Sequence, residues 1–107
     1  MIITTIRLHG LPQKRKEIIQ TVRGLADQMA KDDGCNYADF YQDLHDKNVF
    51  YLMEEWKTAS DLENHKKSKS YAVLFGLEAL LVESLEIKHA VKCKLEKKDA
   101  KERVVQE

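Results

Sequence analysis

A segment near the middle of the chain, residues 50–56, reads as a strand with large side chains on both faces. Side chains alternate along a strand, so Phe50, Leu52 and Trp56 share one face and Tyr51 and Met53 share the other. Neither face suits water. We therefore expect this strand in the interior of a sheet that is covered on both sides, and the rest of the chain must supply the cover.

A short helix is expected directly after this strand. The chain turns at Lys57, and Thr58 is placed as an N-cap with Asp61 three residues on, a spacing in which the two residues satisfy free backbone N–H groups. This helix carries His65. The only tryptophan of the chain, Trp56, and a histidine therefore belong to one strand-turn-helix unit, which is where we expect a functional site.

Further elements follow from the spacing of apolar residues. Residues 2–9 alternate as a strand, and residues 12–32 repeat apolar positions every three to four residues, as in an amphipathic helix that begins at Pro12 and ends at Gly34. The complete set of expected elements is a strand at 2–9, a helix at 12–32, strands at 35–42 and 50–56, helices at 58–67 and 71–81, and a strand at 84–93.

Charge and composition narrow the classes of function. Lysine plus arginine equals aspartate plus glutamate at 18 each, so no net positive field is available for nucleic acid or an anionic membrane. No apolar run approaches the length of a membrane span, and the amino terminus alternates like a strand rather than a secretory leader, so we expect a cytoplasmic protein. Cys35 and Cys93 stand far apart without metal-ligand spacing, which favours two ordinary thiols and no metal.

The order strand, helix, strand, strand, helix, strand predicts an α+β fold of the ferredoxin-like, split βαβ type. Its four-stranded antiparallel sheet has all helices on one face. The other face would leave an apolar patch in water, so we expect a second copy to cover it, giving a homodimer. Residues 1–93 form this domain, and residues 94–107 form a tail dense in both charges.

The string EEWKTASDLENHKKSKSY at residues 54–71 resembles the signature of the antibiotic biosynthesis monooxygenase (ABM) domain family. There a strand ending in Glu-x-Trp leads into a helix with a histidine, here Glu54, Trp56 and His65. The resemblance implies a dimeric α/β barrel and oxidation of a small aromatic or quinol-like substrate by O2 without metal, flavin or other cofactor. Quinol-oxidising relatives commonly carry a second histidine where this chain has Ser70, and haem-degrading relatives carry one where it has Phe75.

The resemblance and the local pattern together suggest the site residues. His65, Trp56 and Glu54 are expected to be catalytic, with His65 as the base that deprotonates a phenol or quinol, and Phe50, Tyr71 and Phe75 are expected to bind the substrate. Each also has a structural interpretation: Trp56 as a core residue, His65 as a surface residue. Glu54 shares a face with apolar residues, and its structural interpretation is an ion pair with a basic residue on a neighbouring strand, such as Arg7.

Three functions are compatible with these residues. The first is a cofactor-independent monooxygenase with a small aromatic ligand, and the second is a non-catalytic domain that binds or senses a small ligand in the same pocket. The third is an isomerase or cyclase acting on a ketone with the same base. His9, His45 and His89 are interpreted as structural, because they have no convergent partners in the sequence pattern.

Overall fold

The computed structural model describes residues 1–93, and the expected charged tail lies outside them. Four antiparallel strands form one sheet in the order β2-β3-β1-β4, and this confirms the ferredoxin-like α+β fold. The strands are β1 (Ile2–His9), β2 (Cys35–Gln42), β3 (Val49–Trp56) and β4 (Glu86–Val91); the helices are α1 (Arg15–Met29), α2 (Ala59–His65) and α3 (Lys69–Gly76), with 3-10 turns at Pro12–Lys14 and Leu77–Leu80.

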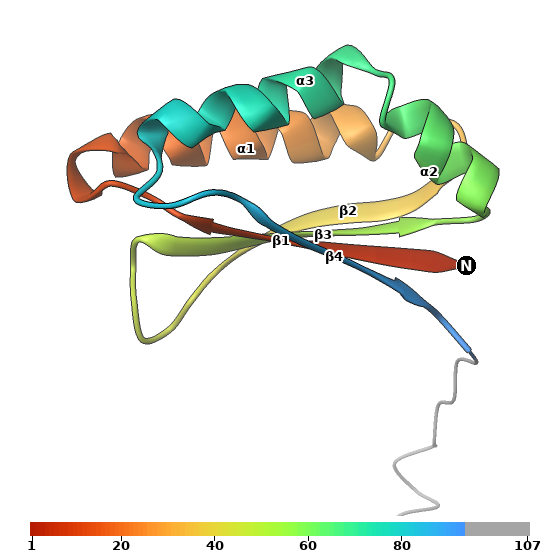
Figure 1. Ribbon diagram of the computed structural model, residues 1–107, viewed down its shortest axis with the longest axis horizontal. Helices are drawn as coiled ribbons and strands as arrows, with labels where there is room; N and C mark the ends of the chain where they lie inside the picture. The colour runs from red at the N-terminus through yellow and green to blue at the C-terminus, as the bar shows by residue number, and fades with distance from the viewer. Residues whose placement is uncertain (94–107) are drawn as a thin grey trace, which may run out of the picture.

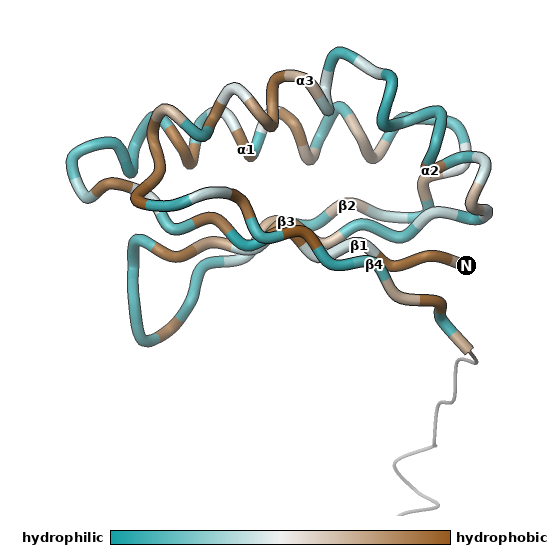
Figure 2. Tube along the Cα trace, viewed as in Figure 1, coloured by the Kyte–Doolittle hydropathy of each residue, from teal (hydrophilic) through white to brown (hydrophobic). Residues whose placement is uncertain are grey.

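All three helices lie on one side of the sheet (Figure 1). The core fills the space between these layers. Ile6 and Leu8 of β1 and Leu52 of β3 are fully buried beneath the apolar stripe of α1, whose buried members are Ile18, Val22, Leu25, Ala26 and Met29. Apolar and polar residues alternate along the trace of α1, as expected for a helix with one buried face (Figure 2).

The strand β3 lies between β1 and β2, as its two bulky faces predict. Its register places Leu52 opposite Ile6 and Phe50 opposite Leu8, all toward the helices. Tyr51 and Met53 point to the other face, where they are half-buried although no helix covers that side. The sheet is therefore covered on one face only within the described chain.

The ends of two helices differ from the sequence-based expectation. The α-helix α1 ends at Met29 instead of residue 32. At residues 31 and 32 the backbone N–H groups bond to the carbonyl three residues back instead of four, as Asp32 N–H does to Met29 O at 3.0 Å. The helix α3 begins at Lys69 instead of residue 71, because Ser68 caps it by accepting from the backbone N–H of Tyr71. The expected N-cap of α2 is confirmed, since the side chain of Thr58 accepts from Asp61 N–H at 3.1 Å.

Gly34 lies in the turn that joins the end of α1 to the start of β2. It has a φ of +82°, and a Cβ there would collide with the side chain of Asp61. Its carbonyl also accepts the backbone N–H of Lys57 at 2.8 Å, so the turn before β2 is tied to the turn after β3. Only glycine meets both conditions without strain.

Gly34→Ala is therefore expected to lower the free energy of unfolding by about 1–3 kcal/mol, because the new side chain is strained in this backbone conformation and crowded by Asp61. Chemical denaturation measures the change. Gly24→Ala is the matched control: Gly24 lies in α1 with open space around it, and alanine there should stabilise by up to about 1 kcal/mol. Equal stability of the Gly34 variant and wild type would contradict the assigned role of this turn.

None of the helices in residues 1–93 has the length and apolar content that crossing a membrane requires.

Candidate functional site

The end of β3 and the helix α2 bring three of the expected residues together. The imidazole of His65 stacks on the indole of Trp56, with ring centroids 4.5 Å apart and an interplanar angle of 25°. The Trp56 Nε1–H donates to Glu54 Oε1 at 2.8 Å. All three are buried: Trp56 and Glu54 are 1% exposed and His65 is 4% exposed.

Two further aromatic rings extend the group onto α3. Tyr71 meets His65 edge to face at 5.5 Å, and Phe75 meets Tyr71 in the same way at 5.0 Å. Tyr71 is half-buried, whereas Phe75 is 42% exposed. Indole, imidazole and these two rings form one continuous aromatic row from the sheet to the surface.

The structure does not bring Phe50 to this group. Phe50 lies on the same face of β3 as Trp56 but six residues earlier, which is about 20 Å along a strand. Its ring instead stacks on Phe40 of β2 at 5.4 Å, within the core beneath α1.

The expected ion pair between Glu54 and Arg7 is wrong. Arg7 is opposite Tyr51 on the uncovered face of the sheet, and its guanidinium pairs with Glu83 at 3.2 Å. The basic side chain within 4 Å of Glu54 in the described residues is His65, whose Nε2 lies 3.9 Å from Oε1.

Burial sets the protonation of this pair. Loss of water raises the pKa of Glu54 to about 7, against a smaller opposing effect of the Trp56 N–H bond. Burial lowers the pKa of His65, and the nearby Asp32 carboxylate partly offsets this. Glu54 therefore titrates near neutral pH, and burial favours the neutral imidazole of His65, the form that can accept a proton.

The two imidazole nitrogens of His65 face different surroundings. Nδ1 lies 3.5 Å from Ser68 Oγ and 3.8 Å from Asp32 Oδ2, and Nε2 points toward Glu54. Glu54 Oε2 and His65 Nε2 have no hydrogen-bond partner although both are buried. An unpaired buried polar atom usually costs about 1–3 kcal/mol, so this arrangement is unfavourable for folding alone.

A hollow of about 200 Å³ opens on the Nδ1 side of His65. The rings of Trp56 and His65 form part of its wall, and the other lining residues are polar: Asp32, Asp33, Asp61, Asn64 and Ser68. Its volume is below the range of drug-sized ligand pockets, so it suits a single small ring.

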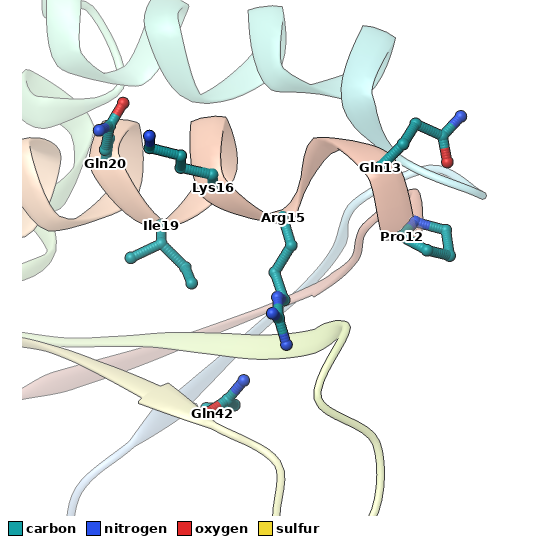
Figure 3. A pocket seen from close by; sticks show the side chains of 7 residues that line it. All are labelled: Pro12, Gln13, Arg15, Lys16, Ile19, Gln20 and Gln42. Carbon is teal, nitrogen blue, oxygen red and sulfur yellow. The ribbon is translucent and has the colours of Figure 1, made fainter.

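A larger hollow of about 700 Å³ lies elsewhere, between the start of α1 and the end of β2. Figure 3 shows Arg15 pointing from α1 toward Gln42, whereas Gln13 and Pro12 point away from them. The lining has no carboxylate, histidine or cysteine side chain and therefore no acid-base pair. We therefore assign the site to the smaller hollow.

Cys35 is opposite Trp56 in the register of β2 and β3. Burial, together with the carboxylates of Glu54 and Asp32, raises the pKa of its thiol to about 11. The thiol therefore stays protonated near neutral pH, which excludes Cys35 as a nucleophile.

Sequence reasoning missed four polar residues around this site. Asp32 and Ser68 flank Nδ1 of His65, and Thr4 lies directly opposite Glu54 on β1, where it is hydrogen-bonded to His89 Nδ1 at 2.8 Å. The strand alternation could have placed Thr4 and His89 on the helix side of the sheet. Among residues 1–93, no group of three or more metal-ligating side chains is present.

A sequence model of the family described as antibiotic biosynthesis monooxygenase matches residues 1–75. The chain belongs to this family. The ABM domain thus includes β1 to α3 and with them every residue of the aromatic row.

Individual relatives of this ABM protein are distant. The putative monooxygenase YcnE of Bacillus subtilis is 21% identical over 71 residues, covering 66% of this chain and 75% of YcnE. A solved structure of a putative antibiotic biosynthesis monooxygenase from Deinococcus radiodurans has a TM-score of 0.85 at 19% identity, covering 94% of this chain and all of that one. A conserved protein from Methanosarcina mazei Go1 has a TM-score of 0.80 at 26% identity, covering 86% and 92% of the two chains.

Proposed function

We propose that this protein is a cofactor-independent monooxygenase that oxidises a phenol or quinol of one ring with O2. The observation that carries the proposal is the imidazole of His65, which stacks on Trp56 and has Nδ1 directed at a hollow of about 200 Å³. A base beside an aromatic wall suits a substrate with an acidic hydroxyl on a ring. Membership of the ABM family supports the same chemistry.

The chemistry begins with a proton transfer. His65 accepts the hydroxyl proton, and the resulting anion gives one electron to O2, which forms a radical pair that recombines on the ring. One oxygen atom of O2 stays on the ring as the quinone product forms, and the other leaves as water, so the quinol supplies all the electrons. The indole of Trp56 forms the apolar wall of the hollow and limits the access of water to the radical pair, whereas Tyr71 and Phe75, which were expected to bind the substrate, do not line this hollow.

Oxygen uptake measured on a panel of single-ring hydroquinones and phenols tests this proposal. Uptake that depends on enzyme and on substrate, with one quinone formed per O2, is the expected result. A protein that takes up no O2 above the rate of spontaneous oxidation across the panel would be no oxygenase.

One observation favours a second function, the binding or sensing of a small ligand. Ser70, which stands where quinol-oxidising relatives commonly carry a second histidine, lines a groove with Thr21 and Gly24 of α1 and does not line the hollow beside His65. Saturable quenching of the single tryptophan by a phenol, without oxygen uptake, would support this binding function. Anaerobic conversion of a ketone would instead support an isomerase or cyclase.

The proposal includes a homodimer formed through the uncovered face of the sheet. Tyr51 and Met53 of β3 lie half-buried there beside Thr5 and Ile3 of β1, and no helix covers them. A second copy packed sheet to sheet would bury this central strip. Cys35 and Cys93 are free thiols, which suits a reducing compartment such as the cytoplasm.

Sedimentation at micromolar concentration is expected to give one species of twice the chain mass of 12.4 kDa. Met53→Lys should shift the equilibrium toward the single chain, because a charge would be buried at the centre of the interface. Lys57→Met, at an exposed turn, is the control and should leave the dimer intact. A wild-type protein that sediments near 12.4 kDa would contradict the dimer.

A further inference from the structure

The only two buried side-chain polar atoms without a hydrogen-bond partner in residues 1–93 belong to neighbouring groups. They are Glu54 Oε2 and His65 Nε2, and Nε2 lies 3.9 Å from the other oxygen of the same carboxylate. A carboxylate only accepts hydrogen bonds, and an imidazole nitrogen donates when it carries a proton. One proton on Nε2, donated to this carboxylate, would give Nε2 a partner after a movement of about 1 Å, which brings Nε2 and Oε1 within hydrogen-bond distance.

The surroundings of Nδ1 favour this location of the proton. Ser68 Oγ accepts the backbone N–H of Tyr71 at 3.3 Å, so its own hydrogen is free to be donated to His65 Nδ1 at 3.5 Å. Nδ1 is then an acceptor. In a neutral imidazole the other nitrogen, Nε2, carries the proton and directs it at Glu54.

The groups that face this pair provide no competing cation. From β1, Thr4 lies opposite Glu54, and His89 of β4 is bonded to Thr4. From β2, Ala38 is opposite Glu54, and the thiol of Cys35 lies nearby. Asp32 faces the outer side of His65, Tyr71 of α3 meets its ring edge, and no lysine or arginine in the described part of the chain forms an ion pair with Glu54.

We propose that Glu54 is a positioning residue that acts through His65 and that the two hold one proton between them. This role rests on the proposed function and deepens it. Glu54 in its ionised form orients the Nε2–H tautomer of His65, which leaves Nδ1 as an acceptor. A hydroxyl in the hollow can then give its proton to Nδ1 in place of the hydrogen bond from Ser68 at 3.5 Å.

The transfer can be written as two coupled proton movements. The O–H bond of the bound phenol breaks and an N–H bond forms at Nδ1, while the N–H bond at Nε2 breaks and an O–H bond forms on the Glu54 carboxylate. His65 is neutral before and after the transfer. The negative charge moves from the buried carboxylate to the phenolate oxygen, where it is available for the electron transfer to O2.

The single tryptophan allows a test without substrate. The indole N–H of Trp56 donates to Glu54 Oε1, so its NMR resonance should report the ionisation of that carboxyl. In wild type we expect this resonance to titrate with a midpoint near pH 7. Glu54→Gln should abolish the titration. His65→Phe keeps an aromatic ring over Trp56 without a donor, and it should raise the midpoint by about one pH unit or more.

Two further variants complete the experiment. His65→Gln retains an N–H donor and should raise the midpoint less than phenylalanine does, which keeps the test usable if the larger ring disturbs folding. His89→Gln changes another histidine on the same face of the sheet and should leave the midpoint unchanged. An indole resonance that does not titrate between about pH 5 and 9, or whose midpoint is the same in the His65 variants as in wild type, would overturn the pairing.

The result is separable from that of the oxygen-uptake experiment. A linked titration without oxygen uptake supports the proton-sharing pair and removes the oxygenase. Oxygen uptake without a linked titration removes the pair and leaves the oxygenase.

Discussion

His65→Ala is expected to lower the turnover of a phenolic substrate by roughly 10²-fold or more, because removal of a positioned base typically costs 10²- to 10⁴-fold in rate. The loss should fall on turnover, because the aromatic wall of the hollow remains in Trp56. Oxygen-uptake kinetics and the melting temperature are measured on the same preparation, so that the rate is expressed per folded molecule.

Two variants serve as controls for this result. His89→Ala removes a histidine that is bonded to Thr4 and lies away from the hollow, and its turnover should stay near wild type. Trp56→Phe keeps a ring beneath His65 but removes the N–H bond to Glu54. Turnover of the His65 variant equal to wild type would exclude His65 from the mechanism and make ligand binding the better interpretation of the site.

Glu54→Gln is expected to remove a large pH dependence of stability. The pKa of Glu54 is raised in the folded protein from its ordinary 4.5 to about 7. The folded state therefore holds this proton more tightly than the unfolded state, and stability is lost as the pH rises from 4.5 through 7. At about 1.4 kcal/mol per pH unit, the loss is on the order of 3 kcal/mol between about pH 4 and pH 8.

Denaturation curves of wild type and Glu54→Gln at both pH values measure this effect. The variant should gain stability relative to wild type as the pH rises. Glu55→Gln is the control, because bonds from Lys92 and Asn36 lower the pKa of the Glu55 carboxyl, so its contribution is present above the ordinary pKa and lost in acid. A constant difference between wild type and Glu54→Gln across this range would show that the buried carboxyl does not titrate as proposed.

The sequence predicts the order of strands and helices along the chain and the neighbourhood of Trp56 and His65, because both depend on local rules. Alternation along β3 separates its faces, and the capped turn at Thr58 returns the chain over the end of that strand. Alternation also gives the face of Glu54. The helix side of β1 carries Thr4, so Arg7 lies on the opposite face of the sheet. For this reason the expected ion pair between Glu54 and Arg7 does not form.

Other parts of the site depend on distances that no local pattern contains. Phe50 shares a face with Trp56, but the length of β3 separates them. Asp32 and Ser68 belong to turns whose positions are set by the packing of α1 and α3, so their approach to Nδ1 of His65 appears only in the folded chain. The empty hydrogen-bonding positions of Glu54 and His65 are likewise a property of the packed interior.

The turn at Gly34 has a consequence for the range of substrates that this scaffold can be engineered to accept. Asp32 lies two residues before this glycine, and Asp61, which fills the space of its absent side chain, forms another wall of the hollow. A larger residue at position 34 would displace the side chain of Asp61 and so change this wall of the hollow, at a cost in backbone strain. The size of the substrate ring that the hollow accepts and the thermal stability of the fold are thus coupled at residue 34. A library that varies residues 34 and 61 together would test how far each of these properties can change.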